Sequence, residues 1–419
     1  MDGVTRARAR RCRRNVRRAL AAALLAGTVL ILAARHAHAQ APCEASEHGM
    51  RADGSDNVAA LTRTLAECAG RTIHIGAGTY SFNPSGFAPG LTVPAGTTIL
   101  GDGSQGPNQT VLRIADSGNF MAFLWIRNAS NVSLRRLRFE GTAHESGCTL
   151  HDYGHAVWVQ SDPGPGDSMN EIDISDDVFH NFNGQSWISV AAEDGSPGIG
   201  LAGKITITGN VFVSDADLRG GCAGSGPMGW AVAMIWLHGS NLSDRGMVEN
   251  VAVTSNTFDA GYVRTAVAIW SGTFRISVQN NAIHDAGFRL PNPPGTDLGR
   301  YAILIYNSAH VGPRLLPGLH PDTIWIVGNT ITNPYSCGVY VASAQNLEIT
   351  GNRISGQRDR YDVSLPKGAI ALNHAVNVRV QDNELSDNYV AIAAAGTQVS
   401  ADDNHIVVPP GGTRAKIAP

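Results

Sequence analysis

The strongest constraint on the fold is a short repeat in the second half of the chain. Its pattern is aliphatic-x-aliphatic-x-x-Asn-x-aliphatic, and its closest copies lie 21 to 25 residues apart. Alternation with a period of two indicates strands, and a repeat of this length indicates stacked coils of strand. The seven full copies run from ITITGNVF to VSADDNHI and place the asparagine at Asn210, Asn256, Asn281, Asn329, Asn352, Asn383 and Asn404.

Two earlier segments resemble the repeat but lack the asparagine. IDISDDVF has Asp177 in that slot, and VSLRRLRF has Leu137. Asparagine tolerates the left-handed backbone conformation and bonds readily to nearby backbone groups. We therefore predict that the asparagine is a structural turn residue that bonds neighbouring coils.

Seven further apolar strands each carry one aromatic residue between aliphatic neighbours. Successive side chains of a strand point to opposite faces, so aromatics flanked by core residues should face outward in one column. An outward indole offers sugars a flat apolar surface and an N–H donor, which predicts the floor of a carbohydrate-binding groove. The alternative is that the rings only stack on one another and stabilise the sheet. The predicted column comprises Trp125, Trp158, Trp187, Trp236, Trp270, Tyr306 and Tyr340, and it ends where Ala371 takes the slot.

One helical segment precedes these strands. The pattern from Asp56 to Ala69 predicts a helix with Ser55 or Asp56 as its N-cap and Gly70 as its end. No later segment has a clear period of 3.6 residues.

The stretch GSDNVAALTRTLAECAGRTIHIGAGTYSF, then LTVPAGTTILGDG and the asparagine repeats, resembles the pectate-lyase-like right-handed parallel β-helix superfamily. Within it, the chain is most similar to the rhamnogalacturonase/epimerase-like branch, over residues 47–410. The resemblance implies an all-β fold, a right-handed parallel β-helix (solenoid) of about nine or ten coils with an N-terminal capping helix. This coil carries hydrolases, lyases, epimerases and non-enzymes, so the fold alone does not give the function.

The resemblance also orients the coil. It implies that the aromatic strands form the first of three sheets, whose outer face usually floors the substrate groove. It further implies that long insertions beside these strands form the groove walls. In this chain the insertions fall at 141–155, 161–170, 214–229, 285–300, 309–321 and 355–367.

The N-terminus predicts an export signal over residues 1–39. Eight arginines between Arg6 and Arg18 precede an apolar run from Ala19 to Ala34 and a small-residue site ending at Ala39. We therefore expect a secreted or periplasmic protein without membrane insertion. Residues 40–419 should form a single β-helix domain, with 40–70 as its cap.

Charge and cysteine content refine this picture. Without the signal, which holds nine arginines and one aspartate, 23 basic and 34 acidic residues remain, a formal net charge of −11. This balance argues against a nucleic-acid partner.

Export favours disulfides, and one arrangement of the five remaining cysteines pairs Cys43 with Cys68 and Cys148 with Cys222. Cys337 would then stay a free, buried residue.

Two arginines occur in register with the aromatic strands. Arg264 lies six residues before Trp270 and Arg300 six before Tyr306, and Lys367 has a similar position. Such a basic column can hold a substrate carboxylate through paired hydrogen bonds. The resemblance implies that Arg or Lys can also abstract the proton α to the carboxylate. The alternative is an ordinary salt bridge with a nearby aspartate.

Candidate acids and bases are less clearly grouped. His238 shares the outward face of Trp236, and Asp259 and Asp297 lie near the arginines in sequence. The candidate catalytic residues are thus Arg264, Arg300, Asp259, His238 and Asp297, with Lys367 and the seven aromatics as substrate-binding residues.

Metal and cofactor signals are weak. His151 and His155 in HDYGH would need a helix to converge on a metal, and none is predicted there. Calcium, which some lyases of the superfamily require, could bind Glu171, Asp173, Asp176 and Asp177, although alternating acids are common on solvated strands. We expect no cofactor.

Known catalytic motifs of the superfamily are absent. The chain lacks the polygalacturonase set (NTD, DD, GHG, RIK), the DPHD motif of mannuronan epimerases and the vWiDH…RxPxxR pattern of pectate lyases. No family catalytic residue can therefore be transferred. The sequence predicts an exported polysaccharide-active enzyme, with Arg264 and Arg300 favouring a lyase on a uronic-acid polymer. A glycoside hydrolase and a non-catalytic polysaccharide-binding or cell-surface protein are the alternatives.

Overall fold

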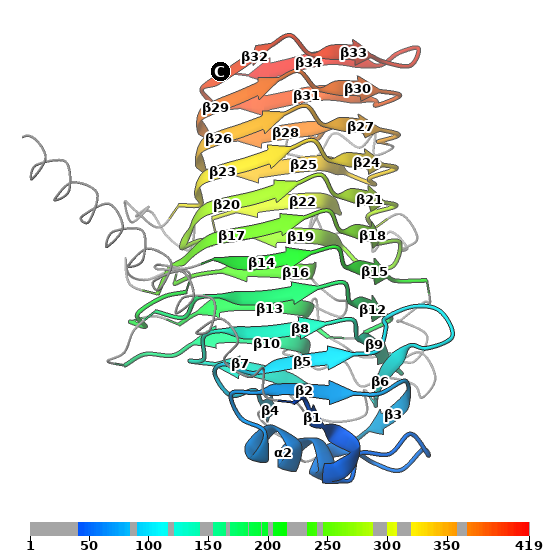
Figure 1. The fold of residues 1–419 in the computed structure, drawn as a ribbon. Coiled ribbons are helices and arrows are strands. Elements are labelled where there is room, and N and C mark those ends of the chain that lie inside the picture. The colour runs from blue at the N-terminus through cyan, green and yellow to red at the C-terminus, as the bar shows by residue number, and fades with distance from the viewer. Residues whose placement is uncertain are drawn as a thin grey trace, which may run out of the picture. The chain divides into compact units, whose positions relative to one another are not determined.

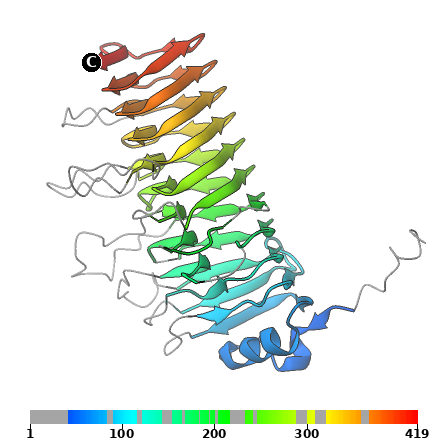
Figure 2. The ribbon, with the colours of Figure 1, turned by 90° about the vertical axis from the view of Figure 1, so that its left-hand side faces the viewer.

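The computed structural model describes residues 41–418, except 84–89, 116–120, 143–153, 165–167, 183, 194, 200–203, 216–232, 241–245, 288–299, 308–319 and 358–366. Within this part of the chain, three parallel sheets stack strand upon strand along one axis (Figures 1 and 2). We call them sheets A, B and C, with 12, 11 and 11 strands. After β1, the chain visits sheets A, B and C in turn, so each coil contributes one strand to each sheet.

Sheet A consists of β1 (Cys43–Glu44), β2 (Thr72–Ile75), β5 (Thr98–Gly101), β8 (Val132–Arg135), β11 (Ile172–Ser175), β14 (Ile205–Thr208), β17 (Val248–Thr254), β20 (Thr273–Gln279), β23 (Asp322–Val327), β26 (Gln345–Thr350), β29 (Val376–Gln381) and β32 (Val399–Asp402). Sheet B consists of β3 (Gly78–Phe82), β6 (Thr110–Ile114), β9 (Arg138–Gly141), β12 (Val178–His180), β15 (Val211–Val213), β18 (Thr257–Asp259), β21 (Ala282–His284), β24 (Thr330–Thr332), β27 (Arg353–Ser355), β30 (Glu384–Ser386) and β33 (His405–Val407). Sheet C consists of β4 (Leu91–Thr92), β7 (Leu124–Arg127), β10 (His155–Ser161), β13 (Ser186–Ala192), β16 (Ala233–His238), β19 (Thr265–Ile269), β22 (Tyr301–Tyr306), β25 (Cys337–Ala342), β28 (Ile370–Asn373), β31 (Val390–Ala395) and β34 (Thr413–Ala418).

The all-β solenoid expected from the repeat is confirmed. The described chain makes eleven complete coils rather than nine or ten. The difference arises because the first two coils, β2–β4 and β5–β7, come before the first recognisable copy of the repeat.

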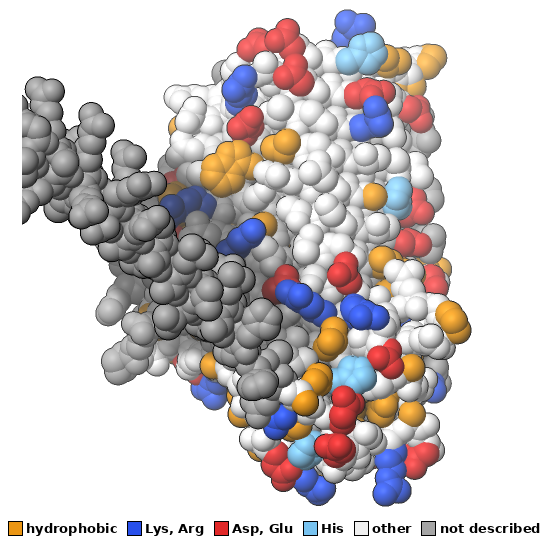
Figure 3. Space-filling model, in the orientation of Figure 1, with side chains coloured by type: hydrophobic (Ala, Val, Ile, Leu, Met, Phe, Trp, Pro, Cys, Tyr) orange, Lys and Arg blue, Asp and Glu red, His pale blue; other side chains and the backbone are white. Residues whose placement is uncertain are grey.

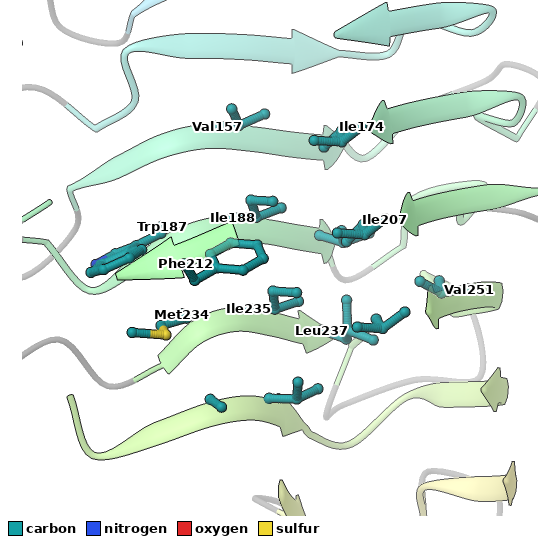
Figure 4. Packing of buried hydrophobic residues seen from close by; sticks show 14 of the residues in the cluster. Val157, Ile174, Trp187, Ile188, Ile207, Phe212, Met234, Ile235, Leu237 and Val251 are labelled. Atoms are coloured by element: carbon teal, nitrogen blue, oxygen red, sulfur yellow. The ribbon is translucent and has the colours of Figure 1, made fainter. Parts of the chain in front are cut away.

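The core runs through the inside of the coils. Aliphatic side chains point inward from sheets A and C, as Ile174, Ile207 and Ile188 do in Figure 4. Sheet B contributes a stack of phenylalanine rings, with centroids 4.7 to 5.0 Å apart, in the order Phe139, Phe179, Phe212 and Phe258. Burying such large side chains is the dominant favourable contribution to folding.

The repeat asparagines form a continuous ladder of hydrogen bonds at the turn between sheets A and B. Asn210 shows the pattern, because its backbone N–H and its Nδ2 both donate to Asn256 Oδ1, at 2.9 and 3.0 Å. Its Nδ2 also donates to the carbonyl of Ile174 on the preceding coil, at 2.9 Å. The predicted bonding role of these residues is confirmed, because the ladder continues to Asn404.

The predicted left-handed backbone at the asparagine is wrong. Positive φ angles fall on the residue just before each asparagine instead, at Gly209, Ser255, Asn280, Gly328, Gly351, Asp382 and Asp403. The asparagine itself turns inward, because its side chain must reach the backbone of both neighbouring coils.

Asp177 stands at the start of this ladder. Its Oδ1 accepts a hydrogen bond from the Leu137 N–H at 2.7 Å, and its backbone N–H donates to Asn210 Oδ1 at 2.9 Å. Its Oδ2 is buried and has no hydrogen-bond partner in the described part of the chain. Burial raises the pKa of the Asp177 carboxyl well above its usual value, so the folded state favours the protonated form.

We expect Asp177→Asn to stabilise the protein at neutral pH by about 1–3 kcal/mol. The amide would supply an Nδ2 donor where the carboxylate leaves Oδ2 unpaired, with no charge to desolvate. Because the folded-state pKa is raised, ionisation destabilises the wild type as the pH rises above the usual range of aspartate. The advantage of Asp177→Asn should therefore shrink on acidification toward pH 4 in denaturant titrations. A variant that is less stable than the wild type at pH 7 would contradict this.

The N-terminal end contains a 3₁₀-helix, η1 (Ala45–His48), and one α-helix, α2 (Val58–Glu67). Leu61 and Leu65 of α2 are buried and belong to the same core cluster as the first coils. The N-cap is Asn57 rather than Ser55 or Asp56. Asp56 precedes the N-cap by one residue, and its Oδ1 accepts a hydrogen bond from the N–H of Val58, the first residue of the helix, at 3.1 Å.

One of the two expected disulfides is present. Cys43 and Cys68 are bonded, which joins β1 to the end of α2. Cys337 is buried and is not part of a disulfide, as expected. Cys148 and Cys222 lie outside the described residues, as does the predicted export signal. Among the described helices, none has the length and apolarity that a membrane span would need.

Candidate functional site

The outer face of sheet C carries a row of large aromatic side chains in register. Trp125 pairs directly with Trp158, which continues through Ser189 to Trp236 on the next coils. The same row then passes through Ala268, Leu304 and Tyr340 and reaches Ala371. Trp125, Trp158, Trp236 and Tyr340 therefore share the column that the sequence predicts, and the aromatics end at Ala371 as expected.

Trp187 does not belong to this column, so its predicted outward position is wrong. It is fully buried in the core, with its ring 6.2 Å from that of Phe212 (Figure 4). The reason is that two successive residues face the core where a sheet C strand begins, here Trp187 and Ile188, so strict alternation fails there. The outward position of this coil belongs to Ser189.

Trp270 and Tyr306 lie in a second row, two residues further along their strands than the column. Leu237 pairs with Ile269, which places Trp270 beside His238. The Trp270 ring meets Trp236 edge-on at 4.8 Å and Tyr306 at 5.7 Å. The single predicted column is thus two adjacent rows that are joined through Trp236.

Hydrogen bonding divides the tryptophans into two groups. Trp125 Nε1 donates to Gln160 Oε1, and Gln160 Nε2 donates to Glu193 Oε1, both at 2.8 Å. In contrast, Nε1 of Trp158, Trp236 and Trp270 on the outer face has no partner within the described residues, and neither has Oγ of Ser189. Nε1 of Trp187, inside the coil, is unpartnered as well. Buried polar groups normally have partners, so the four donors of the outer face mark a place where a ligand or water completes the surface.

Two imidazoles flank the interrupted part of the column. His155 Nδ1 lies 2.9 Å from Ser186 Oγ, and its ring is 5.2 Å from Trp158. His238 stacks on Trp236 at 4.1 Å. Burial lowers the pKa of His155 to about 3, helped by the proximity of His238, and lowers the pKa of His238 to about 4. Both rings are therefore neutral at pH 7, and they are better suited to hydrogen bonding than to donating a proton.

The predicted basic residues lie together where the sheet C strands begin. Arg264 and Arg300 immediately precede the paired residues Thr265 and Tyr301. Ser336 takes the same position on the next coil, because Cys337 pairs with Tyr301. Lys367 takes it on the coil after that, because Ile370 pairs with Val339 and each lies three residues further along the chain than Lys367 and Ser336. Sequence reasoning therefore placed these side chains correctly on neighbouring coils, with a serine between Arg300 and Lys367.

Both arginines are deeply buried, with 7% of Arg264 and 5% of Arg300 exposed. Arg300 donates to the Gly287 carbonyl at 3.0 Å and lies 4.5 Å above the Tyr335 ring. Burial lowers the pKa of Arg264, and the neighbouring Arg300 guanidinium lowers it further. Burial and the neighbouring charge therefore both disfavour the cationic form of Arg264.

Asp259, the predicted catalytic carboxylate that lies within the described residues, is not on this face. Asp259 ends β18 in sheet B, where it pairs in register with His284 and Val213. Asp297 and Asp152 lie outside the described residues. The strands of sheet C contain no aspartate or glutamate at all. Two described carboxylates directly follow strands of this face, Asp162 after β10 and Glu193 after β13, and Asp162 pairs with Arg127 of β7. Sequence reasoning missed both, because no motif surrounds them.

The four acids considered for calcium are used separately. Asp173 is outward on sheet A, where it pairs with Arg135 at 2.8 Å and accepts from Thr206. Asp177 instead points into the coil as part of the ladder. The one His/Cys/acid cluster close enough to bind a metal in the described chain is Cys43, His48 and Cys68, whose two sulfurs form the disulfide.

Sheet A offers no comparable surface. Its outer face carries a broad area of uncharged polar side chains over the middle coils (Figure 3). A single tryptophan, Trp325, stands on its strands, between Ser277 and Glu348. Within the described strands, the outward aromatic rows of sheet C therefore have no counterpart on sheet A.

Comparison with known proteins agrees with this architecture. A model for a right-handed β-helix region matches residues 266–412, and no curated protein sequence matches the chain. Among solved structures, PfbA, a surface adhesin of Streptococcus pneumoniae, is similar with a TM-score of 0.59 and 13% identity over 89% of this chain and 93% of that one. The mannuronan C-5 epimerase AlgE4 A-module of Azotobacter vinelandii has a TM-score of 0.52 and 14% identity, over 90% and 95%. Endo-xylogalacturonan hydrolase from Aspergillus tubingensis has 0.51 and 15%, over 90% and 95%.

The class that these observations define is the right-handed parallel β-helix. The chain has the fold of the pectate-lyase-like superfamily, as its repeats indicate. At such low identities the similar structures show the fold and not the activity. Assignment to the rhamnogalacturonase/epimerase-like branch stays a prediction.

Proposed function

We propose that the protein is an exported, polysaccharide-active enzyme that binds a glycan along the outer face of sheet C. The observation that carries the proposal is the set of indole N–H groups of Trp158, Trp236 and Trp270, which are aligned on one face without partners in the described chain. Sugars combine apolar faces with hydroxyl oxygens, so they can cover the rings and accept these hydrogen bonds together.

The chemistry that the described groups support best is β-elimination on a uronic-acid polymer. A guanidinium pair at Arg264 and Arg300 can hold the uronate carboxylate, and a deprotonated Arg264 can take the proton α to it. The electron pair left behind forms the ring double bond, the bond to the leaving oxygen breaks, and that oxygen takes up a proton. The lowered pKa of Arg264 makes the deprotonated form easier to reach.

Hydrolysis has less support, because two carboxylates must flank the cleaved bond. None stands on the sheet C strands, which leaves Asp162 and Glu193, directly after β10 and β13, as the nearest described candidates. Asp162 pairs with Arg127 and Glu193 accepts from Gln160. A non-catalytic glycan-binding protein is the second candidate. It is supported by the contacts of Arg300, which donates to the Gly287 carbonyl and lies over the Tyr335 ring. These contacts give the arginine a structural role that requires no catalysis.

A panel of acidic and neutral polysaccharides, read in parallel by ultraviolet absorbance and by reducing ends, tests the proposal. A lyase should give both signals on a uronate polymer, because elimination leaves an unsaturated uronide. Reducing ends without absorbance would replace the lyase with a hydrolase. Binding without either product would favour the non-catalytic protein, and no binding to any polymer would overturn the glycan assignment.

A further inference from the structure

The aromatic column of sheet C has one gap, at Ser189. Trp158 and Trp236 are the register partners of Ser189 on the coils before and after it. Two strand spacings place the two tryptophan positions about 9–10 Å apart. The other outward residues of β13 are also small, namely Ser186 and Ala191. A coil with three small side chains therefore stands between coils that carry large rings.

The polar groups around this gap are all donors in need of an acceptor. Trp158 Nε1, Ser189 Oγ and Trp236 Nε1 make no hydrogen bond within the described residues. The three residues are 7%, 0% and 8% exposed, so bulk water reaches them poorly. An indole N–H can only donate, which means that whatever satisfies it must present an oxygen or another acceptor.

The gap also lacks positive charge. The strands β10, β13 and β16 contain no lysine, arginine, aspartate or glutamate. The carboxylate of Glu193 directly follows β13 and accepts from Gln160 of β10. The cation of the neighbouring register row is Arg127, two coils before β13, which lies over the Trp125 ring and is paired with Asp162. The imidazoles of His155 and His238 are neutral at pH 7. A uronate carboxylate at the gap would be repelled by Glu193, and the guanidinium of Arg127 is already paired with Asp162 two coils away.

We infer that the gap at Ser189 is a subsite for one uncharged sugar ring, held between Trp158 and Trp236 with its hydroxyl oxygens on the two indole N–H groups and Ser189. This inference rests on the proposed function, and it adds that the glycan is a heteropolymer. Arg264 and Arg300 immediately precede strands β19 and β22, the first and second strands beyond β16 in sheet C. The neutral subsite and the basic pair would thus contact different sugars of one chain.

The test is binding of hexasaccharides of glucose, mannose, xylose, N-acetylglucosamine and galacturonic acid to the full chain, by calorimetry and tryptophan fluorescence. At least one neutral hexasaccharide should bind. Trp158→Ala and Trp236→Ala should each weaken it about tenfold or more. Ser189→Trp fills the gap and should abolish binding, whereas Ser189→Ala should cost about threefold to tenfold. Trp325→Ala, on sheet A, is the matched control and should change affinity less than twofold.

The outcomes separate this inference from the proposed function. If only the galacturonic acid oligomer binds, or if neutral oligomers bind but all sheet C variants retain the affinity, the subsite is overturned while glycan binding stands. If no hexasaccharide and no polysaccharide binds, both fail. Should Ser189→Trp not fold, as circular dichroism would show, the two alanine variants of the tryptophans still decide.

Discussion

Replacing Asn281 with alanine should lower the free energy of unfolding by about 3–5 kcal/mol. Asn281 lies in the middle of the ladder and is 2% exposed. Its Oδ1 accepts from both the N–H and the Nδ2 of Asn256, at 2.9 and 3.0 Å. Its Nδ2 donates to the Val253 carbonyl and to Asn329 Oδ1, both at 2.9 Å. Alanine would leave these groups of the two neighbouring coils buried without partners.

Denaturant unfolding followed by circular dichroism measures this effect. Asn108→Ala is the control, because Asn108 is exposed outside the ladder, and it should change stability by less than about 0.5 kcal/mol. An Asn281→Ala variant that matches the control would show that the ladder adds little to stability. In a solenoid each coil contacts only its neighbours, so the loss of stability should be largest in the coils that adjoin Asn281. Hydrogen exchange should therefore show the largest decrease in amide protection in those coils.

Replacing Arg264 with glutamine should reduce the elimination rate on a uronate polymer by about 100-fold to 10,000-fold. Glutamine keeps some hydrogen bonding but can neither pair with the carboxylate as a cation nor take the proton. Because burial and Arg300 lower the pKa of Arg264, wild-type turnover should rise with pH on the alkaline side. The variant should lose that rise.

The matched control is Arg275→Gln. Arg275 is on sheet A rather than on sheet C, and there it pairs with Glu249 at 3.1 Å and lies over the Phe274 ring. Its replacement should leave turnover within about twofold. Equal melting temperatures for wild type and Arg264→Gln would separate a chemical role from a structural one. Unchanged kcat in Arg264→Gln would remove this arginine from the mechanism.

Much of the fold could be predicted because local sequence determines it. Alternating aliphatics and an asparagine at a fixed offset require a strand, a turn and a strand on every coil, wherever the copy lies. The register of Arg264 with Arg300 also followed from counting residues between strands of equal length. The residue that takes the left-handed backbone could not be assigned this way, since several residue types fill that slot, from Gly209 to Ser255.

The site was predicted only in part, for a physical reason. Alternation of apolar and polar residues indicates that neighbouring side chains point to opposite faces of a strand. It does not indicate at which residue the strand begins to alternate. At the start of β13 two successive residues turn inward, and this sends Trp187 into the core. A shift of two residues moves Trp270 and Tyr306 to another row without changing their face. Neither difference leaves a trace in a motif.

The sequence by itself determined the solenoid, the outward placement of most of the aromatics and the grouping of the basic residues, because each depends on spacing within one coil. Only the tertiary structure decided which side chains of different coils become neighbours. Register between coils set Ser189 between Trp158 and Trp236 and placed Trp270 beside His238. Inter-coil register depends on packing and hydrogen bonds between residues far apart in the chain, which a local pattern cannot contain.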